Sequence, residues 1–198
     1  MINTVALSGG KDSTAMLHIL LENNVDIHKV YFFDTEWEFP EMENHLKLIE
    51  KKTKLHIEII RYYRKFDDLL LYYGWPKTSG GWCTACKRDT CIKYERGIHT
   101  NIVYIGFSAD EEHRAHRDSI YISRNWKIKF PLIENKITEK AALKYCYNLG
   151  YNWDGLYEIF DRVSCFCCPK AGKKRIEALK NNFPLLYEEY LRKINSND

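Results

Sequence analysis

At 198 residues, with 45% hydrophobic and 29% charged side chains, the chain has the composition of an ordinary soluble protein and the length of one domain. No apolar run approaches the roughly 18 residues of a membrane-spanning helix, so we expect no membrane partner. The chain enters a strand pattern without a basic and apolar leader, which predicts a cytoplasmic protein. The formal net charge of +3 is too small to establish a nucleic-acid partner.

Strand and helix patterns alternate over the first 107 residues. The apolar patterns predict strands at residues 3–7, 25–33, 55–60 and 101–107. Helical spacing predicts helices at residues 12–21, 41–52, 66–73 and 86–96. This alternation is typical of an α/β fold with a parallel sheet, right-handed crossovers and flanking helices.

The second half has a different pattern. Residues 122–133 predict a loop with a short strand, and helices follow at residues 138–149, 156–160, 172–181 and 184–194. Thr138 is the expected N-cap of the first of these helices. We therefore expect a single domain, 1–198, with an α/β core over residues 1–107 and a mostly helical, cysteine-containing extension over residues 108–198.

A glycine-rich turn joins the first predicted strand to the first predicted helix in "VALSGGKDSTAML" (Val5–Leu17). Such a turn exposes backbone N–H groups beside the positive end of a helix, which favours phosphate binding. Gly9 and Gly10 let the backbone approach a ligand closely. Ser8 and Ser13 add hydroxyl donors. The alternative is a solvated turn without a ligand.

Two charged residues complete this turn. Lys11 offers a point charge to a phosphate, whereas Asp12 is expected to orient the loop or to meet Mg²⁺. The Walker A pattern needs glycine four residues before the Gly-Lys pair and Ser or Thr after the lysine. Val5 and Asp12 occupy those positions, so this is a different phosphate loop.

Polar residues also follow the second and fourth predicted strands, where open parallel sheets bind ligands. Asp34 and Thr35 could hold a ribose or an adenine edge. Arg114 could meet phosphate or developing negative charge. The alternatives are an ordinary helix N-terminus for Asp34 and a solvated helix face for Arg114.

Seven cysteines include two C-x-x-C pairs, Cys83 with Cys86 and Cys165 with Cys168. Four thiolates suit tetrahedral zinc or a [4Fe–4S] cluster, and spacing alone does not separate the two. The alternative is that these cysteines are small buried hydrophobic residues. Cys167, between two predicted ligands, could replace Cys168, accept a persulfide or be inert.

Several stretches resemble known families. "SGGKDS" resembles the pyrophosphate loop of the PP-loop ATP pyrophosphatases, which have the Rossmann-like adenine nucleotide alpha-hydrolase fold. Within that superfamily, four further stretches resemble the phosphoadenosine phosphosulfate (PAPS) reductase family. They are "DTEWEFPEM", "GFSADEEHR", "WCTACK" and "YEIFDRVSCFCCP". Ser108 stands where that family often has arginine, and Glu36 and Met42 replace a glycine and a threonine.

The resemblance implies ATP and Mg²⁺ as cofactors and favours a [4Fe–4S] cluster over Zn²⁺. It implies catalytic roles for Lys11, Asp12 and Arg114. The nucleotide-binding residues would be Ser8, Gly9, Gly10, Lys11, Asp12, Ser13, Asp34, Thr35, Gly106 and Glu111. The metal ligands would be Cys83, Cys86, Cys165 and Cys168.

Three functions compete. The first is an enzyme that adenylates an acceptor, releases pyrophosphate and transfers sulfur. Its family precedents, DNA phosphorothioation ATPases and tRNA thiolases, imply a nucleic-acid acceptor and a cysteine desulfurase or another sulfur donor. The second is a PAPS or adenylylsulfate reductase, which the lack of a cysteine after Cys168 disfavours. The third is a nucleotide-binding, metal-stabilised subunit without its own turnover. A homodimer or a complex is possible in each case.

Overall fold

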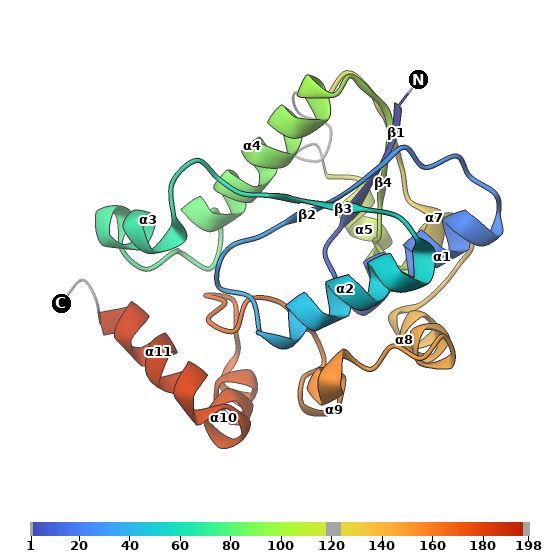
Figure 1. Cartoon of the computed structure of the whole chain (residues 1–198). Coiled ribbons are helices and arrows are strands. Elements are labelled where there is room, and N and C mark those ends of the chain that lie inside the picture. The colour runs from blue at the N-terminus through green and yellow to red at the C-terminus, as the bar shows by residue number, and fades with distance from the viewer. Residues whose placement is uncertain (1, 118–123, 196–198) are drawn as a thin grey trace.

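A computed structural model describes residues 2–117 and 124–195 of the chain (Figure 1). Within them, five parallel strands form one sheet. The strands are β1 (Ile2–Leu7), β2 (Lys29–Phe33), β3 (Ile57–Ile60), β4 (Thr100–Ile105) and β5 (Lys127–Lys129). The predicted parallel α/β fold is therefore confirmed.

The strand order is β3-β2-β1-β4-β5. The chain moves outward from β1 to β2 and β3, then returns to place β4 on the other side of β1. The order therefore reverses between β1 and β4. Open α/β sheets bind ligands at the carboxyl ends of the strands beside such a reversal.

Helices cover both faces of the sheet (Figure 1). Helix α4 (Trp82–Gly97) lies on one side, and α1 (Lys11–Glu22) and α2 (Glu41–Thr53) lie on the other, where α8 (Glu139–Asn148) packs on α1. Apolar side chains between these layers are fully buried, as in Val5, Met16, Val30, Ile49 and Val103. Burial on both faces explains why the strands read as nearly continuous apolar runs.

Short helices dominate the second half of the chain. They are η1 (Ala109–Glu111), α5 (Glu112–Ala115), α7 (Pro131–Glu134), η2 (Trp153–Gly155), α9 (Leu156–Ile159), α10 (Lys173–Asn182) and α11 (Pro184–Ile194). Thr138 is the N-cap of α8, as predicted, and its hydroxyl accepts a hydrogen bond from the Ala141 N–H at 3.2 Å. Because β5 pairs with β4, the sheet extends beyond residue 107.

Some predicted boundaries differ from the structure. Helix α4 begins at Trp82 rather than residue 86, because Gly81 takes an extended backbone conformation and serves as its N-cap. Strand β2 begins at Lys29 rather than residue 25, because its pairing with β1 starts at Thr4 opposite Lys29. The predicted segment 122–133 includes two residues, 122 and 123, that lie outside the described residues.

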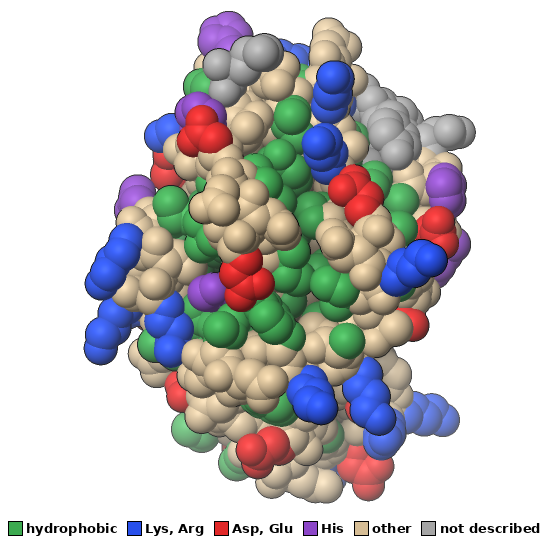
Figure 2. Space-filling view, turned by 90° about the vertical axis from the view of Figure 1, so that its right-hand side faces the viewer, with side chains coloured by type: hydrophobic (Ala, Val, Ile, Leu, Met, Phe, Trp, Pro, Cys, Tyr) green, Lys and Arg blue, Asp and Glu red, His purple; other side chains and the backbone are tan. Residues whose placement is uncertain are grey.

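The surface of the molecule carries both hydrophobic and charged side chains. On the face in Figure 2, hydrophobic side chains form a band down the middle and Lys and Arg side chains lie mainly toward the edges. No helix among the described residues has the length and apolar character needed to cross a bilayer. Helix α3 (Phe66–Tyr73) buries Phe66, Leu69 and Leu70 against the core and leaves its other side open to solvent.

Candidate functional site

The turn between β1 and α1 depends on its glycines. Gly9 has φ +73°, and a Cβ at this position would lie 2.4 Å from the Met42 sulfur. Any larger residue would therefore meet both backbone strain and a clash. Gly10 is the N-cap of α1 in an extended conformation, and its position leaves the start of the helix without a side-chain cap.

Several backbone N–H groups of this turn have no acceptor among the residues that the structure describes. Those of Gly9, Gly10 and Asp12 donate no hydrogen bond to any residue in the described part of the chain. The Lys11 N–H donates to the Tyr157 hydroxyl at 2.8 Å. Unpaired donors at the positive end of a helix attract an anion, so the arrangement suits a phosphate group.

The two serine hydroxyls of the turn bond to each other. Ser13 donates its hydroxyl proton to the Gly10 carbonyl at 3.1 Å and accepts the Ser8 N–H at 3.1 Å. The Ser8 hydroxyl must then donate to Ser13 across 3.0 Å. In this arrangement the serines hold the shape of the turn, and their predicted contact with phosphate remains a prediction.

Lys11 is 4% exposed, and its ammonium lies between two carboxylates. Its Nζ is 2.8 Å from Glu139 Oε2 and 3.2 Å from Asp12 Oδ2. Burial raises the pKa of Asp12, and Lys11 offsets only part of this effect. The other Asp12 oxygen, Oδ1, is buried and has no hydrogen-bond partner among the described residues. A free carboxylate oxygen beside a phosphate site fits Mg²⁺, which binds through one or two carboxylates plus phosphates.

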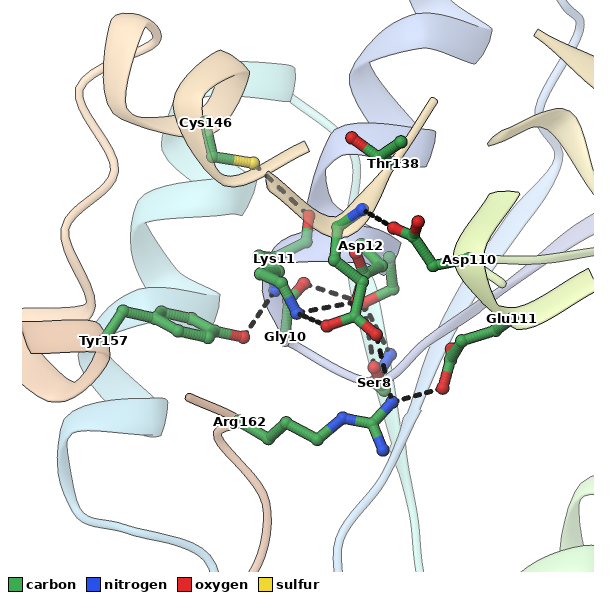
Figure 3. A network of polar contacts seen from close by, with 12 residues as sticks. Ser8, Gly10, Lys11, Asp12, Asp110, Glu111, Thr138, Cys146, Tyr157 and Arg162 are labelled. Carbon is green, nitrogen blue, oxygen red and sulfur yellow. Dashed lines mark hydrogen bonds and ion pairs between the residues drawn. The ribbon is translucent and has the colours of Figure 1, made fainter. Parts of the chain in front are cut away.

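Two arginines reach the same site and share the Glu111 carboxylate, and Figure 3 shows the contact of Arg162 with it. Arg114 Nη1 lies 2.6 Å from Glu111 Oε1, and Arg162 contacts the same oxygen. Burial alone would raise the pKa of Glu111, but the hydrogen bonds and charges of the two arginines outweigh it and hold that pKa below its ordinary value. Arg162 is also 3.7 Å from Glu139. Carboxylates thus hold the three cations that could neutralise a polyphosphate.

The loop after β4 touches the turn after β1. A Cβ on Gly106 would lie 2.7 Å from Ser13 Cα and 2.9 Å from its nitrogen. Only a glycine permits this backbone contact, so Gly106 closes the two loops on each other at the switch in strand order. Nearby, the Ser108 hydroxyl is fully buried and has no partner within the described residues.

The predicted residues after β2 lie at the same edge of the sheet, but other protein groups engage them. Asp34 pairs with Arg61 at 2.7 Å and accepts the Glu36 N–H at 2.7 Å. The Thr35 hydroxyl donates to Glu38 at 2.8 Å. The contact of Asp34 and Thr35 with a nucleotide stays a prediction.

Two stacked rings, Trp153 and His45, support the turn, and the sequence analysis did not identify them. The Trp153 indole N–H donates to the Gly9 carbonyl at 2.7 Å, and its ring stacks on His45 with centroids 4.4 Å apart. His45 Nε2 lies 3.1 Å from the Thr14 hydroxyl. Burial lowers the pKa of His45 to about 3, so the ring stays neutral. Trp153 itself has φ +51°, an unfavourable backbone conformation that the surrounding contacts must maintain.

The four cysteines predicted as metal ligands do not form a ligand group. No three His, Cys, Asp or Glu side chains in the described residues are placed to hold a metal ion. The Cys165 thiol lies 3.3 Å from the Thr35 hydroxyl and 3.5 Å from Glu38 instead. Burial raises the pKa of the Cys83 thiol, and the charge of Cys168 adds to this effect.

Comparison with known proteins identifies the family. The family model described as "Phosphoadenosine phosphosulfate reductase domain" matches residues 2–171. The chain belongs to the PAPS reductase family. The PAPS reductase family lies within the PP-loop superfamily, whose nucleotide-binding fold agrees with the sheet and the turn described above. Membership supports an enzyme of this superfamily in general and leaves the specific activity open.

Two curated proteins are similar to this PAPS reductase-family chain over almost its whole length. The chain is 29% identical over 194 residues to uncharacterized protein MJ0066 of Methanocaldococcus jannaschii, covering 94% of this chain and 40% of that protein. It is 30% identical over 199 residues to uncharacterized protein MJ0973 of the same organism, covering 96% and 46%. The chain therefore spans less than half the length of these relatives.

The contact at Gly106 gives a first prediction. We expect Gly106→Ala to lower the free energy of unfolding by about 1–3 kcal/mol, because the new methyl group must push apart two backbone segments. ATP binding should weaken as well, since the turn moves. Gly97→Ala is the matched control, because a Cβ at this exposed helix position meets nothing within 4 Å. Urea unfolding and ATP titration of both variants test this, and equal behaviour would contradict the close contact.

Proposed function

We propose that the chain binds ATP at the Ser8–Ser13 turn, adenylates an acceptor oxygen and releases pyrophosphate. In the same proposal, sulfur then replaces the adenylate on a nucleic-acid acceptor. The observation that carries the proposal is the turn itself. Unpaired N–H groups, the buried ammonium of Lys11 and two arginines meet at the switch in strand order.

The chain's own groups suggest a division of work. The N–H groups of Gly9 and Gly10 and the Lys11 ammonium would hold the phosphates. When the acceptor oxygen attacks the α-phosphorus, the bond to the bridging oxygen breaks and pyrophosphate leaves. Arg114 and Arg162 would turn from Glu111 toward the phosphates and neutralise the growing charge. Mg²⁺ bound at Asp12 would add further charge neutralisation.

Sulfur transfer completes the proposed sequence. A hydrosulfide donor attacks the adenylated carbon, the carbon–oxygen bond breaks and AMP leaves with that oxygen. A persulfide donor would attack through its terminal sulfur in the same way, and a second thiol would then cleave the resulting disulfide, leaving sulfur on the carbon. A separate desulfurase would supply the donor. Since the cysteine pairs do not form a ligand group, no step is assigned to a metal. A [4Fe–4S] cluster or Zn²⁺ stays a prediction that iron, sulfide and zinc analysis of anaerobically purified protein tests.

The family match itself favours a second candidate, reduction of PAPS or adenylylsulfate. Such a reduction would cleave the sulfate from the nucleotide and release sulfite, with thiols as the reductant. It would need no pyrophosphate release. A third candidate is a subunit that binds nucleotide without turnover, which is compatible with a chain that spans less than half of its relatives.

One pair of assays separates the three candidates. With ATP and Mg²⁺, we expect pyrophosphate and AMP to form when an acceptor such as bulk tRNA or DNA and a sulfide donor are present. With PAPS or adenylylsulfate and thioredoxin, we expect no sulfite. Sulfite release would establish the reductase instead. ATP binding without pyrophosphate release under any condition would favour the subunit.

A further inference from the structure

An exposed group of aromatic side chains lies along α3 and the loop before it. We call the group Tyr62, Tyr63, Leu71, Tyr72 and Tyr73 the tyrosine surface. Tyr63, Tyr72 and Tyr73 are 77%, 72% and 59% exposed, and Leu71 is 66% exposed. Large exposed apolar side chains grouped on one segment mark an interaction site more often than a lone exposed residue does.

The rings of the tyrosine surface are arranged in pairs. Tyr62 and Tyr63 have centroids 4.4 Å apart, and Tyr72 and Tyr73 have centroids 4.7 Å apart at 90°. Contacts within each pair restrict the rotamers before any ligand binds. Less conformational entropy is then lost when a flat ligand group packs against the rings.

The charge around the tyrosine surface is mostly positive. Residues 61–77 contain four basic and two acidic side chains, which are Arg61, Arg64, Lys65, Lys77, Asp67 and Asp68. Lys193 pairs with Asp67, and Asp34 pairs with Arg61, so one acidic and one basic charge of this segment are offset. The Arg64 guanidinium lies 5.5 Å from the Tyr63 ring centroid, so cation and ring lie together. Alternating aromatic and basic groups complement a ligand that has flat bases and phosphates.

We propose that the tyrosine surface binds single-stranded nucleic acid. Unpaired bases would stack on Tyr63, Tyr72 and Tyr73, and phosphates would meet Arg64 and Lys65. A paired duplex buries its base faces and offers nothing to stack on the rings. The proposal extends the proposed function, on whose nucleic-acid acceptor it rests, by naming where that acceptor docks.

The position of the surface supports this role. Arg61 directly follows β3 and pairs with Asp34, which directly follows β2. Because the strands are parallel, these residues lie at the same edge of the sheet as the Ser8–Ser13 turn. The end of the tyrosine surface that carries Tyr62 and Tyr63 therefore follows the same sheet edge as the proposed nucleotide site.

Fluorescence anisotropy with labelled oligothymidine and oligouridine of about 12 nucleotides tests the proposal. We expect the double variant Tyr63→Ala with Tyr72→Ala to bind at least about tenfold more weakly, because base stacking on two rings is lost. Tyr147→Ala is the matched control, since this tyrosine is 41% exposed on α8. Arg64→Ala should flatten the dependence of affinity on salt concentration.

ATP titration of the same proteins separates this proposal from the proposed function. The double tyrosine variant should bind ATP as the wild type does. Oligonucleotide binding without ATP binding would leave the tyrosine surface standing and overturn the ATP proposal. Equal oligonucleotide affinity of variant and wild type would overturn the surface. Two other results would also overturn the proposed nucleic-acid site. One is binding to phosphatidylserine vesicles but not to oligonucleotides, and the other is self-association that the tyrosine variant abolishes.

Discussion

A Lys11→Ala variant is expected to bind ATP about tenfold to a hundredfold more weakly than the wild-type protein. Hydrogen bonds to charged groups contribute about 1.5–3 kcal/mol, and each 1.4 kcal/mol is a factor of ten in affinity. The Lys11 ammonium is buried between Asp12 and Glu139 at the start of α1. Isothermal titration with ATP and Mg²⁺ measures the effect.

A variant that is expected to raise the affinity for ATP makes this test more specific. Glu139→Gln removes the carboxylate that competes with phosphate for Lys11, so ATP should bind more tightly. Loss of fold in either variant would weaken binding, so opposite shifts cannot come from misfolding. Lys51→Ala, at an exposed position on α2, serves as the control for surface charge. An unchanged affinity of Lys11→Ala for ATP would contradict the assignment of the turn as the phosphate site.

The largest loss of stability is expected at Glu95. This carboxylate is fully buried on α4, and it accepts hydrogen bonds from the Tyr31 hydroxyl at 2.5 Å, Arg124 Nε at 2.7 Å and the Trp126 indole at 3.2 Å. It therefore joins α4 to β2 and to the segment that enters β5. Glu95→Gln should lower the free energy of unfolding by about 3–5 kcal/mol, because it removes a buried negative charge on which three hydrogen-bond donors converge.

Denaturant unfolding measures this effect, and two further variants define its cause. Glu177→Gln, at an exposed position on α10, should stay within about 0.5 kcal/mol of the wild type. The double variant Glu95→Leu with Arg124→Met removes both charges and should recover much of the loss, since an apolar pair avoids the desolvation penalty. A wild-type stability in Glu95→Gln would show that the network contributes little.

Much of the fold was predictable because its signals are local. The apolar runs around Val5, Val30 and Val103 mark strands that are buried on both faces. The Ser8–Ser13 turn is recognisable from its glycines and from the helix that follows. The two C-x-x-C pairs are also recognisable from local spacing, but spacing does not determine where a thiol points. Cys165 points to Thr35 and Glu38 rather than into a common ligand group.

The rest of the site was not predictable, because it comes from distant parts of the chain. Tyr157 meets the Lys11 N–H across 146 residues of sequence, and Glu139 meets its ammonium across 128. Trp153 reaches Gly9 across 144 residues. Neither periodicity nor spacing predicts these contacts, even though Tyr157 begins the recognisable stretch "YEIFDRVSCFCCP".

The sequence by itself determined the alternation of strands and helices and the phosphate-type turn, because backbone preference and apolar periodicity act over a few residues. Only the tertiary structure decided that β4 returns beside β1, that Gly106 closes on Ser13 and that carboxylates hold Lys11, Arg114 and Arg162. Those features depend on packing between layers and on charge pairs far apart in the chain. Such contacts exist only once the whole core has formed.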